Sequence, residues 1–347
     1  MRTKINLTPA QLGFRMPAEW ETHEATWLSW PRDLETWPRL EEVEATYVEI
    51  IEQLHTGEKV HILVENAECE DRILKILRER GVTKNINSHV VDTDSIWIRD
   101  YGPMFISHAN NLSMINWSFN AWGRKYPYQK DKLVPGKLAE ILNIKQFKAD
   151  LVLEGGSIEL NGEGTLMTTE ECLLNPNRNP GLRREQIEEC LKDFLGARKI
   201  IWLGKGIEGD DTDGHIDEVA RFVAPDKIVI NTNQDANSYN HKVLKENWQR
   251  LQNETTPGGK CFQLIELPMP ERIVSGKMTL PGSYTNFYIG NKCVLVPIFS
   301  DKKDTKALGI LKDLFSDRNV VGIPAIPLIH GQGAIHCMTQ QEPAHAA

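Results

Sequence analysis

The stretch Asp210-Asp-Thr-Asp-Gly-His-Ile-Asp217 brings an imidazole and several carboxylates together in one short segment. The residues that follow read as a strand, so we predict that residues 215–223 are extended. His215 and Asp217 would then point to the same face, because side chains alternate along a strand. An imidazole beside a carboxylate can move a proton, and an acidic loop can hold a cation. The segment therefore predicts acid–base chemistry on a cationic substrate.

Cys337 is the candidate nucleophile, in His330-Gly-Gln-Gly-Ala-Ile-His-Cys-Met-Thr-Gln340. A single cysteine paired in space with a distant histidine suits that role. A free thiol has a pKa of about 8.5, so a nearby cation such as a bound guanidinium must favour the thiolate. The glycines before it would let the backbone approach a ligand. His336 should point to the other strand face and is not assigned as the base. A buried, inert cysteine is the alternative.

Two further carboxylates lie next to apolar stretches. Asp100 ends the segment 92–100, whose alternation predicts a strand, and Glu154 ends an apolar run and precedes two glycines. A carboxylate drawn into an apolar site must be paired or hydrogen-bonded. The alternative for Glu154 is a glutamate at a turn. Trp97 and Trp122 could contact a cation through their ring faces, with core packing as the alternative for both.

These residues recur at the start of a repeated order of elements. A strand–strand–helix–strand unit is predicted three times, with a looser copy over residues 97–153, and an Asn161-Gly162 turn joins one hairpin. The units are strands 157–160 and 165–168, helix 182–195 and strand 199–203; strands 215–223 and 227–232, helix 238–252 and strand 261–266; and strands 284–289 and 292–298, helix 303–315 and strand 319–322.

The two ends of the chain supply the parts of a fifth unit. Strand 25–30, helix 38–54 and strand 58–64 lack a first strand, and strand 335–340 has no helix after it. We predict an α/β fold, a five-bladed, pseudo-fivefold α/β propeller of repeated ββαβ units, forming a single catalytic domain over residues 1–347. An irregular α/β domain is the alternative. The unit heads are Asp100, Glu154, His215, Tyr284 and Cys337. Four of these five are residue types that do acid, base or nucleophilic chemistry, and those four side chains would converge in one pocket.

Composition restricts the function classes. The net charge of −8 argues against non-specific nucleic-acid binding, and no apolar run is long enough to span a membrane. The first residues lack the apolar core of a secretory signal, and the six cysteines are scattered without CxxC spacing. Both observations favour reduced thiols and a cytoplasmic location.

Three other motifs were rejected. Gly204-Lys-Gly-Ile-Glu-Gly209 matches a dinucleotide-binding pattern, but the acidic residues after it would repel a pyrophosphate. A calcium loop centred on Gly214 would have Gly209 and Ala220 at ligand positions. No regular His or Cys spacing indicates zinc. We therefore expect no metal and no cofactor.

At these residues the sequence resembles the agmatine deiminase and bacterial peptidylarginine deiminase family of the guanidino-group-modifying (pentein) superfamily. The resemblance is carried by Phe14-Arg-Met-Pro-Ala-Glu-Trp20, His23-Glu-Ala-Thr-Trp27, Trp97-Ile-Arg-Asp-Tyr-Gly-Pro103, Glu154-Gly-Gly156, Thr212-Asp-Gly-His-Ile-Asp217 and Ile335-His-Cys-Met-Thr-Gln-Gln341. The family's fivefold α/β propeller agrees with the repeats.

The resemblance implies a role for each matched position. Cys337 would be the nucleophile, and His215 the general acid and then the base. Asp100 and Asp217 would grip the guanidinium nitrogens. Glu154 would hold the group and assist proton transfer, and Trp97 would line the substrate channel.

The implied reaction is hydrolysis of agmatine to N-carbamoylputrescine and ammonia, a step towards putrescine. The partner would be a small cationic guanidino substrate, with no nucleic acid or membrane, and a homo-oligomer is left open. Arginine or peptidyl arginine is the alternative substrate, because residues 120–128 are more like the peptidylarginine branch. Arg124 or Lys125 would then have to bind the arginine carboxylate. Amidinotransfer to an amine and non-enzymatic polyamine binding are the other hypotheses.

Overall fold

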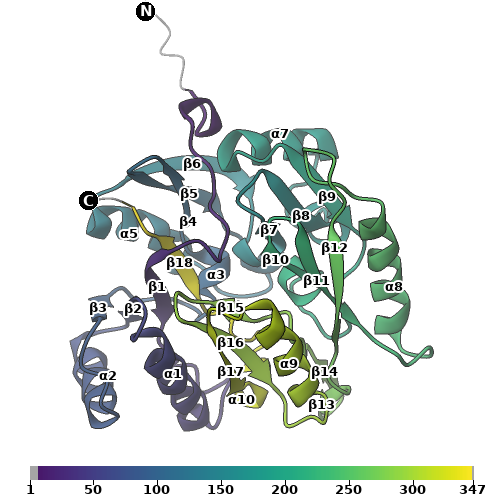
Figure 1. Cartoon of the computed structure of the whole chain (residues 1–347). Helices are drawn as coiled ribbons and strands as arrows, with labels where there is room; N and C mark the ends of the chain where they lie inside the picture. The colour runs from purple at the N-terminus through teal and green to yellow at the C-terminus, as the bar shows by residue number, and fades with distance from the viewer. Residues whose placement is uncertain (1–6, 346–347) are drawn as a thin grey trace, which may run out of the picture.

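The computed structural model describes residues 7–345, and it contains five sheets that share one topology (Figure 1). In each sheet the first two strands are antiparallel, and a third strand pairs parallel with the second. The sheets are β4-β5-β6, β7-β8-β9, β10-β11-β12, β15-β16-β17 and β18-β1-β2-β3. Parallel neighbours require a crossover, and a helix supplies it in each unit.

Most of the strands and helices lie close to the predicted ranges, but the predicted strand 284–289 is reduced to β15. The strands are β1 (His23–Ser29), β2 (Lys59–Val64), β3 (Ile86–Val90), β4 (Met104–His108), β5 (Asn111–Ser118), β6 (Lys145–Val152), β7 (Ile158–Leu160), β8 (Thr165–Thr169), β9 (Lys199–Leu203), β10 (Ala220–Ala224), β11 (Lys227–Thr232), β12 (Gln263–Pro268), β13 (Ile273–Ser275), β14 (Met278–Leu280), β15 (Tyr288–Ile289), β16 (Cys293–Ile298), β17 (Asn319–Pro324) and β18 (Gln340–Pro343).

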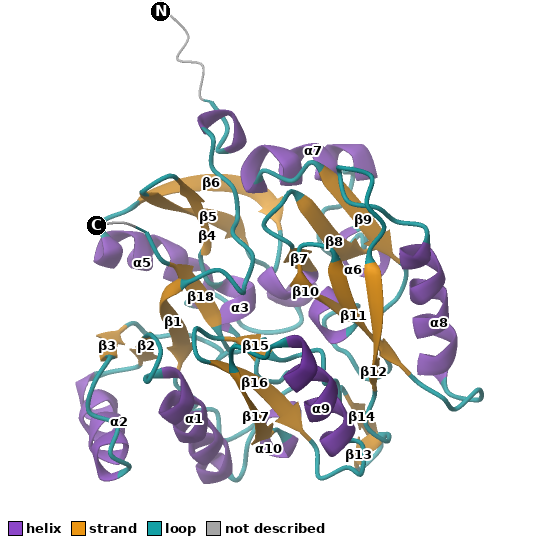
Figure 2. Cartoon of the chain, in the orientation of Figure 1, coloured by secondary structure: helices purple, strands orange, loops and turns teal. Residues whose placement is uncertain are grey.

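The longer helices lie at the periphery and the strands lie further inside (Figure 2). The helices are α1 (Leu40–Leu54), α2 (Ala67–Glu79), α3 (Ile98–Tyr101), α4 (Ala121–Arg124), α5 (Val134–Leu142), α6 (Glu170–Leu173), α7 (Arg184–Leu195), α8 (Tyr239–Gln252), α9 (Asp304–Leu314) and α10 (Ile326–Ile329), with 3-10 turns η1 (Ala10–Leu12), η2 (Asp131–Leu133), η3 (Gly155–Ser157) and η4 (Ile216–Glu218).

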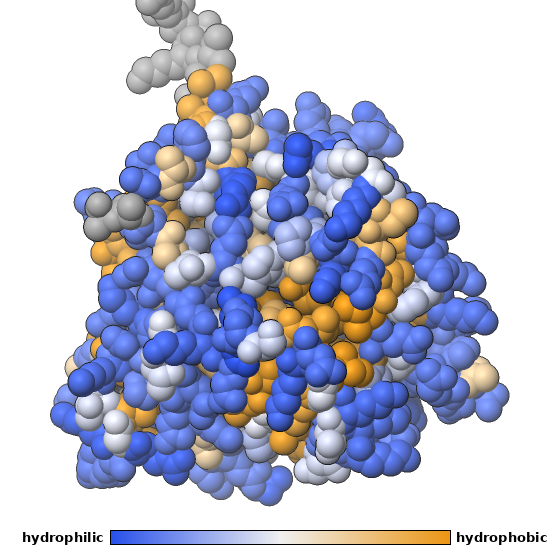
Figure 3. Space-filling model, in the orientation of Figure 1, coloured by the Kyte–Doolittle hydropathy of each residue, from blue (hydrophilic) through white to orange (hydrophobic). Residues whose placement is uncertain are grey.

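Helix α1 shows how these elements arise from the sequence. It buries Val43, Tyr47, Ile50 and Leu54, which are spaced three and four residues apart and so share one face. This face packs against β2 and β16. The outer surface is mostly hydrophilic in the view of Figure 3, with an apolar area near its middle. No helix within residues 7–345 is long and apolar enough to cross a membrane.

Both chain ends build the fifth sheet, as predicted. β18 pairs antiparallel with β1, with Gln340 opposite Trp27, and β1 pairs parallel with β2. The indole nitrogen of Trp27 also donates a hydrogen bond to Glu342, at 2.8 Å. Helix α2 and strand β3 extend this sheet by one strand that the sequence analysis did not predict. The first strands of the units gather towards the middle of the molecule (Figure 1).

Three segments predicted as strands are helical turns instead. Residues 98–101 form α3, residues 216–218 form η4, and residues 335–338 form a turn before β18. Local hydrogen bonds close them, for example from Val219 N to Ile216 O at 2.9 Å. The prediction was wrong because a short alternating run cannot be distinguished from a turn by periodicity. Each turn stands just before the first strand of its unit: α3 before β4, η4 before β10, and the turn 335–338 before β18. The site residues on these turns therefore lie at the inner ends of those strands.

Candidate active site

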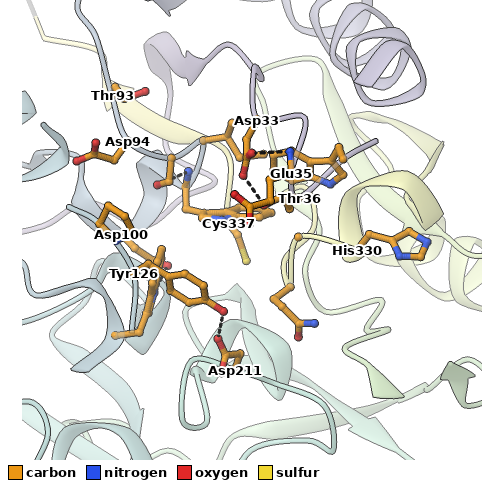
Figure 4. A pocket seen from close by; sticks show the side chains of 18 of the residues that line it. Asp33, Glu35, Thr36, Thr93, Asp94, Asp100, Tyr126, Asp211, His330 and Cys337 are labelled. Atoms are coloured by element: carbon orange, nitrogen blue, oxygen red, sulfur yellow. Dashed lines mark hydrogen bonds between the residues drawn. The ribbon is translucent and has the colours of Figure 1, made fainter. Parts of the chain in front are cut away.

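A cavity of about 750 Å³ opens beside the turn that carries Cys337. Figure 4 shows Cys337 pointing between the segment from Asp33 to Thr36 and the hydrogen-bonded pair of Tyr126 and Asp211. Trp97 and Trp122 also line the cavity, and both are almost fully buried, so each serves as wall and as core. The carboxylates on its wall are Asp33, Glu35, Asp94, Asp100 and Asp211.

The basic side chains on this wall, within the part of the chain that is described, are Arg32 and His330. Arg32 is already paired, because it lies 2.8 Å from Glu65 and 2.8 Å from Asp92. Neither Arg124 nor Lys125 lines the cavity, and Lys125 is paired with Asp213 at 3.0 Å. The cavity is therefore strongly electronegative and suits a cation.

Cys337 is 5% exposed and reaches this cavity. Its sulfur lies 3.1 Å from the side-chain nitrogen of Asn286 and 3.8 Å from Asp217 Oδ2. Burial and the charges of Asp217 and Glu218 raise the pKa of the thiol well above its ordinary value, against a smaller opposing effect of the Ala334 backbone N–H. The unliganded group is therefore a protonated thiol, and a bound cation would favour its ionisation.

His215 is fully buried and lies between two carboxylates. Its Nδ1 is 3.7 Å from Asp100 Oδ1, and its Nε2 is 3.7 Å from Glu154 Oε2. Neither ring nitrogen has a hydrogen-bond partner among residues 7–345. Burial lowers the pKa of the imidazole, but Asp100, Cys172 and Glu154 outweigh it and raise the pKa well above its ordinary value. His215 is therefore an imidazolium that can give up a proton.

Asp100 is held by two donors. The indole of Trp122 donates to Oδ2 at 2.9 Å, and the backbone N–H of Gly156 donates to Oδ1 at 2.9 Å. Burial raises the pKa of Asp100 to about 6, with His215 opposing that shift. The carboxylate thus ionises close to neutral pH, where its charge can respond to a bound cation.

Asp217 points into the same site from η4. Its Oδ2 lies 2.7 Å from His336 Nδ1, while Oδ1 has no hydrogen-bond partner among the described residues. Burial would raise the pKa of Asp217, but the hydrogen bond and charge of His336 outweigh burial and lower it. One oxygen is thus fixed and the other is free to accept a bond from a ligand.

Gly156 marks the point at which three of these side chains meet. A Cβ built there would lie 2.6 Å from His215 Nδ1, 2.9 Å from Asp217 Oδ2 and 3.0 Å from Asp100 Oδ1. Any larger residue would displace them, which explains the second of the two glycines after Glu154. Glu154 adjoins this cluster through His215, and Cys337 adjoins it through Asp217. Of the residues predicted for the site, Trp97, Asp100 and Cys337 line the cavity.

Arg178 holds Glu154 and was not predicted from the sequence. Its side chain is 0% exposed, and its Nε donates to Glu154 Oε1 at 2.8 Å. It also contacts Asp213 at 2.6 Å and the Thr212 carbonyl at 2.6 Å, on the loop that carries His215. Burial opposes ionisation of Glu154, but His215 and Arg178 together lower its pKa. Arg178 lies in a polar loop without periodicity, so nothing in the sequence marks it.

In the fourth unit the predicted head does not line the cavity. Tyr284 donates a hydrogen bond to Asp304 at 2.6 Å. Asn286, two residues later, is the residue of this unit that reaches Cys337. The spacing of the repeat located the right segment, but the turn before β15 places a different side chain at the centre.

The glycines before Cys337 also have a role in packing. A Cβ on Gly331 would lie 2.2 Å from the Trp37 ring, and one on Gly333 would lie 2.7 Å from the Trp97 ring. The ring centroids of the two tryptophans are 6.0 Å apart. The glycines thus let two indoles pack on the segment, and through Trp97 they shape the cavity wall.

The segment around Trp122 has an unusual backbone. Ala121, Trp122, Gly123 and Arg124 all have positive φ, at 53°, 54°, 93° and 66°. Left-handed conformation costs roughly 1–2 kcal/mol for each non-glycine residue. Asn120 holds the turn by accepting a hydrogen bond from the Gly123 N–H at 2.9 Å. This turn carries the Trp122 indole that donates to Asp100.

Within residues 7–345, two buried groups of three could reach a common metal ion: Glu154, Cys172 and His215, and Asp217, Glu218 and Cys337. Both overlap the site described above. We interpret them as acid–base groups, because Arg178 already neutralises Glu154 and His336 already binds Asp217.

The repeated α/β units and the buried cluster of a cysteine, a histidine and carboxylates indicate an α/β enzyme with an acidic active site. The chain belongs to the Porphyromonas-type peptidyl-arginine deiminase family, whose sequence profile matches residues 15–343. The resemblance found in the sequence is thereby confirmed.

Relatives with known structures agree over nearly the whole chain. The agmatine deiminase of Enterococcus faecalis is 32% identical, with a TM-score of 0.90 and full coverage of both chains. A cysteine-to-serine form of the C. jejuni agmatine deiminase, with substrate bound, is 31% identical, with a TM-score of 0.88, covering 96% of this chain and 97% of that chain. A Latilactobacillus sakei relative, assigned provisionally to the agmatine deiminases, is 37% identical over 98% of this chain and 99% of its own.

A more distant likeness concerns the fold alone. An amidinotransferase of Microseira wollei has a TM-score of 0.53 at 13% identity, covering 96% of this chain and 98% of that chain. This supports the predicted pentein fold of mixed α/β units.

Proposed function

We propose that this protein is an agmatine deiminase that hydrolyses the guanidinium group of agmatine to N-carbamoylputrescine and ammonia. The observation that carries the proposal is the meeting of Cys337, His215 and two carboxylates beside one acidic cavity. A guanidinium is planar, permanently charged and rich in N–H donors, so it matches a pair of carboxylates. Asp100 and the free oxygen of Asp217 are placed to accept those donors.

The charges on the cavity wall favour agmatine over arginine. Agmatine has a cationic amine at its far end, whereas arginine has an α-carboxylate. The wall has carboxylates such as Glu35 and Asp211, and its Arg32 is paired with two acids. A carboxylate at the far end would meet repulsion from these acids, so arginine would bind more weakly than agmatine.

The first half of the reaction makes a covalent intermediate. The bound guanidinium offsets the negative field around Cys337, and the thiol gives its proton to solvent. The sulfur then forms a bond to the guanidinium carbon. His215 gives a proton to the departing nitrogen, which leaves as ammonia and takes the electron pair of the broken C–N bond. An S-alkylthiouronium on Cys337 remains.

The second half returns the enzyme to its starting state. His215, now neutral, takes a proton from water, and the resulting hydroxide attacks the same carbon. The C–S bond breaks, and its electron pair returns to sulfur. The hydroxyl proton of the adduct passes to that sulfur, and the neutral ureido product leaves. Glu154 contacts His215 throughout, held in place by Arg178, and so keeps the ring oriented for both transfers. No step needs a metal or an organic cofactor.

A test compares ammonia and ureido product with agmatine, free arginine and a short arginyl peptide. We expect the highest kcat/KM for agmatine and no turnover by Cys337→Ala. Cys293→Ala, which alters a buried cysteine remote from the cavity lining, is the matched control and should stay active. Equal or better activity on the peptide would instead assign the chain to peptidylarginine. Tight agmatine binding without ammonia release would indicate a polyamine-binding protein.

The remaining expectations from the sequence belong to the same proposal. One catalytic domain over residues 1–347 fits the five units, whose fifth sheet unites both chain ends. A cytoplasmic location and a small cationic substrate as partner fit the composition. The oligomeric state stays open.

A further inference from the structure

Asn286 contacts the sulfur of Cys337 in a way that the reaction above does not use. Its side chain is fully buried, and its Nδ2 lies 3.1 Å from Sγ. The other side-chain atom, Oδ1, accepts hydrogen bonds from the backbone N–H groups of His336, at 2.9 Å, and Cys337, at 3.4 Å. The Asn286 backbone carbonyl also accepts from His336 N, at 3.1 Å.

These contacts determine which way the amide faces. Backbone N–H groups are donors only, so the side-chain atom beside them must be the oxygen. The NH₂ group is then left to face Cys337. An amide N–H is a donor, and an ionised sulfur is a far better acceptor than a thiol. The contact should therefore strengthen when the sulfur becomes negatively charged.

The sulfur is otherwise surrounded by groups that oppose its ionisation. Asp217 Oδ2 lies 3.8 Å away and Glu218 Oε1 lies 4.0 Å away. The groups that favour ionisation of the sulfur are the Ala334 backbone N–H and the Asn286 amide. Asn286 is the side-chain donor at the sulfur among the described residues, so it is the group on which a thiolate would depend.

We propose that Asn286 is a further catalytic residue, whose side-chain N–H donates to the Cys337 sulfur and stabilises it as a thiolate. The inference rests on the proposed deiminase function. The donor acts twice: it favours the ionised sulfur before attack, and it receives the sulfur again when the C–S bond breaks and the electron pair returns. It forms no covalent bond and transfers no proton.

A purely structural role is the competing explanation, because Asn286 also supports the backbone of the Cys337 turn. Asn286→Asp separates the two roles. An aspartate retains the oxygen that accepts from His336 N and Cys337 N, but it has no N–H to offer the sulfur. Asn286→Ala removes the donor without adding charge, so it controls for a simple charge effect in the first variant.

The experiment measures alkylation of Cys337 by iodoacetamide as a function of pH, with the Cys337 peptide followed by mass spectrometry. Ammonia release from agmatine is measured in parallel. We expect both variants to move the alkylation profile up by about one to two pH units, so that the rate at a fixed lower pH falls at least about tenfold. Activity should fall near neutral pH and partly recover at higher pH.

Asn247→Asp is the matched control. Asn247 is also fully buried and bonds to backbone, at Gly204 N and Lys205 O, but it does not contact Cys337. Its alkylation profile should follow that of the wild type. Folded Asn286 variants with a wild-type alkylation profile would overturn the inference while the enzyme remains a Cys337-dependent deiminase. Loss of the deiminase proposal itself would show separately, as a wild type that releases no ammonia.

Discussion

At the scale of single residues, the site combines groups that would be unstable alone. Cys337 is a thiol whose pKa is raised by burial and by neighbouring carboxylates, and His215 is an imidazolium whose burial is outweighed by other carboxylates. A bound guanidinium cation would lower the raised pKa of the Cys337 thiol. We therefore expect the substrate itself to promote ionisation of the sulfur, so that free enzyme reacts slowly with alkylating agents.

Trp122→Phe tests whether the indole hydrogen bond lowers the pKa of Asp100. The pKa of Asp100 is about 6, so the carboxylate is ionised above that pH and protonated below it. The indole N–H favours the ionised form, and its loss should raise this pKa. The acid limb of the kcat/KM profile for agmatine should consequently move to higher pH. Trp117→Phe, whose indole nitrogen has no partner in residues 7–345, is the control and should keep the wild-type limb.

Arg178→Met tests the support of Glu154. The change leaves the Glu154 carboxylate buried without its cation, which typically costs about 3–5 kcal/mol. We expect a loss of this order in the free energy of unfolding, measured by urea titration, together with a fall in kcat. Arg183→Met is the comparison, since Arg183 is 76% exposed and its nearest acid is 3.9 Å away. Equal stability of the two variants would show that Arg178 does not hold Glu154.

At the scale of elements, most helices and strands could be predicted, and the turns that carry the chemistry could not. Helix α8 and strand β11 have clear periodicity, and their observed ranges nearly coincide with the predicted ones. Residues 98–101 and 216–218 alternate in sequence but are closed by local hydrogen bonds. Their conformation follows from contacts with other units, such as Gly156 with Asp100, which a local pattern does not contain.

Asp131→Asn tests another such long-range support. Asp131 accepts hydrogen bonds from Asp94 N at 2.6 Å and from the Ser95 hydroxyl at 2.8 Å, and so holds the segment before Trp97. Burial raises its pKa from its ordinary value to about 7. The folded state thus binds a proton more tightly than the unfolded state, and the associated stability is lost as pH rises from about 4 to about 7.

The Asp131→Asn variant cannot titrate there, and its amide can still accept from backbone and donate to Ser95. Between about pH 4 and pH 7 the free energy of unfolding should therefore decline less with pH in the variant than in the wild type. Chemical denaturation across this range measures the difference. Parallel pH dependences in the two proteins would contradict the assigned titration of Asp131.

At the scale of the whole molecule, the sequence was sufficient to predict the five repeated units and the union of the two chain ends. It located the segments that would meet, but not every side chain that meets there. Arg178 and Asn286 lie in loops whose importance depends on contacts with distant residues. Residues that act directly on a ligand are recognisable by type and motif, whereas the residues that hold them are recognisable only in three dimensions.

The fifth sheet leads to a prediction about the C-terminus. β18 begins shortly after Cys337 and pairs with β1, so deleting residues 340–347 removes both a sheet pairing and the support of the turn. We expect this truncation to abolish cooperative unfolding and activity. Deleting residues 345–347 leaves β18 intact and should preserve both. A stable, active protein without residues 340–347 would refute the structural role assigned to the joined ends.

The central claim is covalent catalysis by Cys337, and mass spectrometry during turnover tests it most directly. Acid quenching of the protein in the presence of agmatine should trap an S-alkylthiouronium on the peptide that contains Cys337. The adduct should be absent from Cys337→Ser and should disappear once agmatine is exhausted. Sustained ammonia release without any adduct, and with an active Cys337→Ser variant, would contradict the account.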